Sequence, residues 1–156
     1  MDSPITESTL FLTFHLGEEV FAIEIARIKE VLEFSRVTHI PRTPDFMCGV
    51  INLRGAVVPV VDLRLKFGMT ESERTINTCI IILDVVQEDE TFVIGAMADS
   101  VREVMELDPA RIEPAPKMGT GLRTDFIRGM GRNGERFVIL LDTDRVFSSE
   151  ELARAA

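Results

Sequence analysis

The chain has 156 residues, 46% of them hydrophobic, and a formal net charge of −9 at pH 7. This length fits one domain, or two small and tightly joined lobes, with a proper hydrophobic core. Acidic residues outnumber basic ones by 26 to 17, and Lys and Arg form no stripe that could neutralise phosphates, so nucleic acid is not expected as a partner.

Membrane insertion and secretion are not expected either. The apolar runs are far shorter than the roughly 20 residues that cross a bilayer, and residues 1–9 lack a basic-then-apolar signal pattern. We therefore predict a globular, cytoplasmic protein with a flexible tail over residues 1–9. Cys48 and Cys79 lie in apolar runs without CxxC spacing, so we expect reduced, buried thiols.

The first elements are expected to be strands. Residues 10–16 alternate with the period of a half-buried strand, and residues 17–19 turn the chain into a second strand over residues 20–23. The segment from Glu24 onward fits both a helical stripe and an alternating strand. We predict a single helical turn followed by a strand.

That strand has a functional implication. If residues 28–32 are extended, Ile28 and Glu30 share one face, while Lys29 and Val31 share the other. One face would then carry both an apolar and an acidic contact.

Residues 46–67 contain the clearest local pattern of the chain. The β-branched runs 50–53 and 57–61 are typical of two strands joined by a tight turn. Asn52 can bond its own backbone and Gly55 can adopt positive φ, so residues 52–55 are predicted to form the turn and to hold Arg54 at a loop tip. A short helix is predicted to follow, with Asp62 as its N-cap.

An internal repeat organises the rest of the chain. Residues 29–33 (KEVLE) are echoed by residues 102–106 (REVME). Residues 46–49 are echoed by residues 126–129, at an offset of 80 positions. The echoes predict two similar β lobes, over about residues 10–68 and 78–147 with a linker at 69–77. An exchange of strands between the lobes stays open.

Two further expectations follow from this architecture. Each lobe alone would have a marginal core, so we expect the lobes to pack together and to leave a groove between them. Ser148 and Glu151 form a capping box, which predicts a short C-terminal helix within residues 148–156.

No set of residues for catalysis or for a cofactor can be assembled. The segment GMGRNG at residues 129–134 matches GxGxxG, but an apolar strand follows it where a helix would be needed, so a hairpin with Asn133-Gly134 as a type I′ tip is predicted. Residues 142–144 begin like a calcium loop but lack its later ligands and are expected to start a helix. His15 and His39 belong to no metal or catalytic motif. We expect a protein that is not an enzyme and that holds no metal or cofactor.

The turn NLRG, followed by VVPVVDLR, resembles the CheW family of chemotaxis adaptor proteins, and the resemblance runs from about Phe11 to Phe147. It implies a mainly β fold of two small SH3-like five-stranded barrels with short helical turns. It also implies a non-enzymatic adaptor that couples the cytoplasmic tips of methyl-accepting chemoreceptors to the histidine kinase CheA, at membrane-associated receptor arrays.

The resemblance also suggests interface residues. In such proteins the Arg of NLRG and the Glu of the preceding strand mark the surface that assembles receptors with the kinase, which here means Arg54 and Glu30. We expect these two residues to form a surface ion pair on one lobe, because the strand after Ile28 and the NLRG hairpin would belong to the same small sheet. The expected partners are the regulatory domain of CheA, a receptor tip and other copies of the adaptor. An alternative from another class is a small-ligand-binding β module that regulates an enzyme. The full set of expected interface residues is Ile28, Glu30, Gly49, Arg54, Val101 and Val104.

Overall fold

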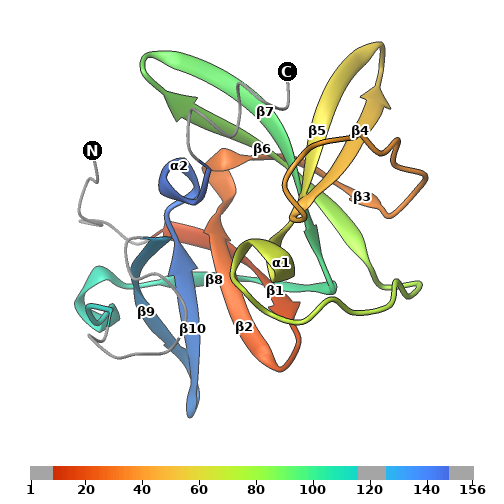
Figure 1. Ribbon diagram of the computed structural model, residues 1–156. Helices are drawn as coiled ribbons and strands as arrows, with labels where there is room; N and C mark the ends of the chain where they lie inside the picture. The colour runs from red at the N-terminus through yellow and green to blue at the C-terminus, as the bar shows by residue number, and fades with distance from the viewer. Residues whose placement is uncertain (1–8, 116–125, 148–156) are drawn as a thin grey trace.

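The computed structural model describes residues 9–115 and 126–147, which form two five-stranded antiparallel-rich sheets, here called lobe A and lobe B (Figure 1). Across its sheet, lobe A contains β8 (Ser100–Leu107), β1 (Thr9–Leu16), β2 (Glu19–Glu24), β10 (Arg136–Leu141) and β9 (Ile127–Asn133). Lobe B contains β3 (Ile28–Glu33), β6 (Cys79–Gln87), β7 (Glu90–Ala98), β5 (Ala56–Asp62) and β4 (Met47–Leu53). The predicted mainly β fold of two similar lobes is confirmed.

The two sheets have the same pattern of strand pairing. In each, an edge strand and a hairpin pair antiparallel, the hairpin's second strand runs parallel to the next strand, and a second antiparallel hairpin ends the sheet. In each lobe, the segment after one edge strand forms an isolated β-bridge to the strand at the opposite edge of the sheet. Thr38 pairs with Val50 on β4 in lobe B, and Glu113 pairs with Met130 on β9 in lobe A. These bridges give both sheets a barrel-like closure.

The lobes do not coincide with the sequence repeats. The β1–β2 hairpin of the first half joins β8, β9 and β10, and the β6–β7 hairpin of the second half joins β3, β4 and β5. The contiguous allocation of strands to residues 10–68 and 78–147 is therefore wrong, and the exchange that stayed open in the sequence is present. Alternation shows that a strand faces a core, but it does not show which of two similar cores it faces.

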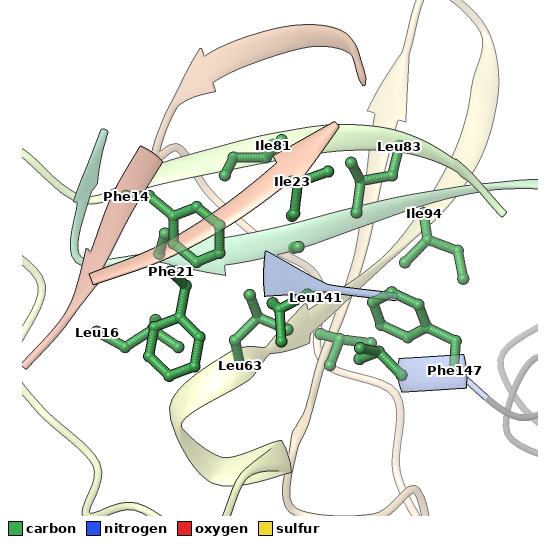
Figure 2. Close-up of a cluster of buried hydrophobic side chains, with 14 of the residues drawn as sticks. Phe14, Leu16, Phe21, Ile23, Leu63, Ile81, Leu83, Ile94, Leu141 and Phe147 are labelled. Atoms are coloured by element: carbon green, nitrogen blue, oxygen red, sulfur yellow. The ribbon is translucent and has the colours of Figure 1, made fainter. Parts of the chain in front are cut away.

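The largest hydrophobic cluster lies between the lobes, where it explains why they pack together. It combines side chains from both sheets and both helices, whereas the clusters inside the single lobes are small. In Figure 2 the labelled side chains of this cluster point toward one another. Phe14, Phe21 and Phe67 stack in series, with ring centroids 5.9 and 5.6 Å apart. Each lobe depends on the other to bury this surface.

In each lobe, the strand that runs parallel to its neighbour, β5 or β10, leads into a short helix with an aspartate as its N-cap. In α1 (Leu63–Lys66), the Asp62 carboxylate accepts bonds from the backbone N–H groups of Arg64 and Leu65 at 2.9 and 3.4 Å. In α2 (Thr143–Val146), Asp142 is the N-cap in the same way. Both predicted helix starts are confirmed. Two 3-10 turns, η1 (Ile25–Arg27) and η2 (Pro109–Arg111), also occur.

The helical turn before β3 is confirmed as η1, while the predicted C-terminal helix at 148–156 lies outside the described residues. Two turn assignments need correction. The β4–β5 tip has Arg54 and Gly55 as its central residues, with φ of 51° and 89°. The β9–β10 hairpin is confirmed, but its central residues are Gly134 and Glu135 rather than Asn133 and Gly134, because Asn133 pairs with Arg136. Of the central pair only Gly134 has positive φ, which excludes type I′.

Candidate functional site

Arg54 and Glu30 form an ion pair on the surface of lobe B, as predicted. Arg54 Nη1 lies 3.4 Å from Glu30 Oε1, and Nη2 is paired with Oε2, so the contact is bidentate. The Arg54 side chain stays 70% exposed and the Glu30 side chain 27% exposed. The hydrogen bond to Glu30 and its negative charge raise the pKa of Arg54. Glu30 therefore orients a cation that remains available to a partner.

The backbone at Arg54 is unfavourable for an arginine. Its φ of 51° lies in the left-handed region, which non-glycine residues occupy at a cost of about 1 kcal/mol or more. Gly134 stands at the equivalent tip of lobe A, 80 positions later, with φ of 68°. Asn52 supports the lobe B turn by accepting a bond from the Gly55 N–H at 2.8 Å. A strained residue where the other lobe has glycine points to a role outside folding.

Ile28 and Glu30 do not share a face, contrary to the sequence expectation. Ile28 is paired with Leu83, whereas Glu30 is paired with Ile82, so the register shifts between them. Because Leu83 and Ile82 point to opposite faces of β6, the bulge rotates Ile28 toward the cluster between the lobes. Ile28 is thus partly buried there, and Glu30 points toward the β4–β5 tip.

An apolar groove opens beside the Arg54–Glu30 pair. It has a volume of about 620 Å³ and is lined by residues of the β4–β5 and β6–β7 hairpins. The ribbons of these two hairpins diverge in Figure 1. The register pairs that join β5 to β7 begin only at Val60 and Gly95, which leaves the earlier parts of both strands apart. The groove is lined by Lys29, Leu53, Arg54, Ala56, Val57, Val58, Pro59, Thr91, Phe92, Val93 and Ile94.

This groove lies within lobe B, whereas the sequence led us to expect a groove between the lobes. The space between the lobes holds the largest hydrophobic cluster. Val57, which is 71% exposed, forms part of the groove wall and was not among the predicted interface residues. Its equivalent 80 positions later, Phe137, is also exposed, at 47%. The repeat offset was the available signal for both residues.

Gly49 is buried and offers no side chain to a partner. A Cβ built there would lie 2.0 Å from the Thr38 carbonyl oxygen, and its φ is 144°. Thr38 and Val50 exchange two backbone hydrogen bonds of 2.9 Å beside it. The glycine is therefore required by the closure of lobe B, and its part in an interface stays a prediction.

Val101 and Val104 lie on lobe A, whereas the other predicted residues lie on lobe B. Both are on the edge strand β8, where Val104 is 51% exposed and Val101 packs against the cluster between the lobes. Beside Val104, the Glu103 carboxylate accepts a bond of 3.2 Å from the Asn133 amide at the β9–β10 tip. Glu103 is thus the counterpart of Glu30, but its partner at the tip is uncharged.

The described residues present little reactive chemistry. Burial raises the pKa values of the Cys48 and Cys79 thiols to about 11, and both cysteines are free. Such thiols are protonated and unreactive at neutral pH. Among residues 9–115 and 126–147, no group of three or more His, Cys, Asp or Glu side chains could hold a metal. No helix within these ranges is long and apolar enough to cross a membrane.

Taken together, an exposed oriented cation, an apolar groove and an edge strand with an exposed valine are features of a protein-docking module built from two barrels. Comparisons with known proteins define the module further. Residues 10–151 match the model of the CheW-like domain. The chain therefore belongs to the CheW-like family.

Individual relatives agree with this assignment. The chain is 41% identical to the chemotaxis protein CheW of Klebsiella aerogenes, over 92% of this chain and 84% of that one. It is 32% identical to the CheW of Rhizobium meliloti, over 90% and 88%. The crystal structure of the scaffolding protein TtCheW from Thermoanaerobacter tengcongensis is similar with a TM-score of 0.82 and 30% identity, covering 97% of this chain and 92% of that chain.

The protein is accordingly a non-enzymatic adaptor of chemotaxis signalling. The alternative of a small-ligand-binding module finds no support in these relatives.

Proposed function

We propose that this adaptor couples the cytoplasmic tips of methyl-accepting chemoreceptors to the regulatory domain of the histidine kinase CheA, at receptor arrays in the cytoplasm. The observation that carries the proposal is Arg54. It is exposed, oriented by Glu30 and held in a strained conformation where lobe A has glycine. The membership in the CheW-like family supports the same role.

The interface residues expected from the sequence support two contact surfaces. Arg54 lines the groove on lobe B, Glu30 pairs with it, and Ile28 is the first residue of the same edge strand as Glu30. Val101 and Val104 lie on lobe A. Two surfaces on different lobes would let one copy contact a kinase and a receptor at the same time, and further copies of the adaptor could join such an array.

The test is the variant Arg54→Glu. An exposed ion pair contributes about 0 to 1 kcal/mol, so we expect a nearly unchanged melting temperature. At a partner interface the reversed charge can cost several kcal/mol, so we expect loss of receptor-coupled kinase activation. The measurement is CheA autophosphorylation in reconstituted receptor membranes with wild-type or variant adaptor.

Arg132→Glu is the matched control. Arg132 is also exposed, at 55%, and also pairs with a glutamate on its own lobe, with Nε 2.9 Å from Glu113 Oε2. We expect this variant to retain kinase activation. Full activation by a folded Arg54→Glu protein would instead make Arg54 an ordinary solvated turn residue.

A further inference from the structure

Two ion pairs tie the halves of the chain together at equivalent places. Arg27, immediately before β3, donates to the Asp144 carboxylate on α2 with N–O distances of 3.2 and 3.0 Å. Asp99, immediately before β8, accepts from Arg64 Nη1 on α1 at 2.8 Å. We call these pairs clamp 1 (Arg27–Asp144) and clamp 2 (Arg64–Asp99). Each joins the connector before one half's edge strand to the helix of the other half.

The clamps also hold equivalent backbone groups. Val86 N–H donates to Asp144 Oδ1 at 2.9 Å, and Gly17 N–H donates to Asp99 Oδ2 at 2.6 Å. These two amides occupy equivalent positions. Phe14 is paired with Val101 in lobe A as Leu83 is paired with Ile28 in lobe B, so Phe14 and Leu83 are counterparts at an offset of 69 positions. The same offset relates Gly17 to Val86. In one clamp the acid is on the helix, and in the other it is on the connector. On the helices the two positions are equivalent, because Asp144 lies 80 positions after Arg64. On the connectors, Asp99 lies one residue before Ser100, the counterpart of Arg27 at an offset of 73. The charges are therefore exchanged between helix and connector.

The sign of the charge depends on which half of the chain supplies it. The first half, β1 to β5 with α1, supplies both arginines, and the second half, β6 to β10 with α2, supplies both aspartates. If two first halves paired in the same geometry, Arg27 would meet Arg64. If two second halves paired, Asp99 would meet Asp144. Both wrong pairings would bring like charges together twice, at sites where the side chains are only 15% to 35% exposed.

We infer that the two clamps are a recognition code that makes each half accept the other half and reject a second copy of itself. A code is needed because the fold is built by strand exchange. Each sheet combines strands of both halves in the same order, so an identical half from another molecule would offer a similar backbone. The clamps reject it by repulsion while the hydrophobic cluster supplies the attraction.

Other ion pairs between the halves lack this property. Lys29 Nζ lies 3.8 Å from Asp84 Oδ1, and Arg128 on β9 pairs with Glu24 on β2. The positions equivalent to Lys29 and Asp84 are Arg102 and His15, at offsets of 73 and 69. A pairing of two first halves would therefore place Lys29 near His15, without two full like charges. Reversal of the Lys29–Asp84 pair provides a matched control.

The decisive variant is Arg64→Asp with Asp99→Arg. It reverses clamp 2 and makes it a copy of clamp 1, with the acid on the helix and within reach of the Gly17 N–H. Each half then carries one cation and one anion, so two identical halves would form attractive clamps. The uncut variant should unfold at a urea concentration close to that of the wild type, whereas Arg64→Asp alone and Asp99→Arg alone should unfold earlier.

The test of recognition starts from the full chain with a protease site in place of residues 71–73, in the linker between the halves. The folded protein is cut, unfolded in urea and refolded, and native mass spectrometry identifies which halves have paired. We expect wild-type halves to form only mixed pairs. In the Arg64→Asp/Asp99→Arg protein, pairs of identical halves should rise about tenfold or more. The control Lys29→Asp/Asp84→Lys should behave like the wild type.

The opposite results would overturn the inference. Identical halves pairing equally in wild type and variant would show that the charges select nothing. If pairs of identical halves form in neither the wild type nor the variant, the apolar core alone determines which halves pair. If the cut variant does not refold, the reversal of clamp 1, Arg27→Asp with Asp144→Arg, gives the same test at the other site.

Discussion

The tips of the two lobes share an architecture and differ in chemistry. In both, a glutamate on the edge strand reaches the tip of the last hairpin, as Glu30 does to Arg54 and Glu103 to Asn133. The residue in the left-handed region is Arg54 in lobe B and Gly134 in lobe A. Lobe A thus keeps the residue that the backbone favours, and lobe B keeps one that it disfavours. Such a difference between repeats separates what the fold needs from what a partner needs.

The largest expected difference between the lobes is the loss of stability when the glycine beside each lobe's isolated β-bridge is replaced by alanine. Gly49→Ala would place a Cβ 2.0 Å from a backbone oxygen, which cannot move without opening the bridge from Thr38 to Val50. We expect a loss of about 3 kcal/mol in the free energy of unfolding. At the equivalent Gly129, the nearest atom is the Ile112 Cγ2 side-chain carbon at 2.6 Å, so Gly129→Ala should lose only about 1 kcal/mol. Equal losses in urea unfolding would contradict this account.

The next difference lies in the hairpins that the halves exchange. The β1–β2 turn has Gly17 at φ of 63°, whereas the β6–β7 turn has Glu88 and Asp89 at φ of 50° and 66°. Two consecutive non-glycine residues there fit a type I′ turn poorly. Replacing Glu88-Asp89 by Asn-Gly should raise the free energy of unfolding by about 2 kcal/mol. An unchanged melting temperature would show that this turn stores no strain.

A smaller effect should distinguish the two tips directly. Gly134→Arg should lose about 1 kcal/mol of stability, because it reproduces the strain of Arg54 without the pair to Glu30. Arg54→Gly should be nearly neutral, since relief of strain offsets the loss of an exposed ion pair worth about 0 to 1 kcal/mol. Thermal unfolding of both variants would measure this. A strongly destabilised Arg54→Gly protein would mean that Arg54 serves the fold.

The smallest effect is a dependence on pH at the start of α1. Burial raises the pKa of Asp62 above its usual 3.8, despite the opposing backbone hydrogen bonds from Leu65 and Arg64. The folded state then binds more protons than the unfolded state between the two pKa values, so the Asp62 contribution becomes more favourable as pH falls through that range. Asp62→Asn should be at least as stable as wild type at pH 7, and the difference should shrink toward pH 4. A wild-type advantage at pH 7 that disappears in acid would reverse this sign.

Local patterns in the sequence predicted the local features of the molecule. Asp62 and Asp142 were identified as helix starts, and the pair of Arg54 and Glu30 was predicted because their strand and hairpin were expected to belong to the same small sheet. The residues that the sequence misplaced depend on single-residue shifts. One bulge at β3 sends Ile28 and Glu30 to different faces, and a register shift of one residue moves the tip of β9–β10. Neither shift changes the composition of a strand, so periodicity cannot detect it.

The exchange of hairpins between the lobes could not be predicted from the sequence either, for a different reason. The hairpins β1–β2 and β6–β7 have similar apolar patterns, and either could cover either group of three strands. The choice depends on side-chain contacts between residues far apart in sequence, such as clamp 1 between Arg27 and Asp144. Val57 and the groove were missed because an exposed valine in a strand gives no signal by itself.

The exchanged hairpins also determine the order in which the chain can fold during synthesis. Lobe B consists of β3 to β7 and is complete once Ala98 has been made, whereas β1 and β2 must wait for β8, β9 and β10. β1 and β2 therefore leave the ribosome before the other strands of this domain and are among the last to find their sheet. Until then, lobe B exposes the apolar face that later joins the lobes. We expect nascent chains that end between residues 98 and 126 to be the most prone to aggregation and to chaperone binding.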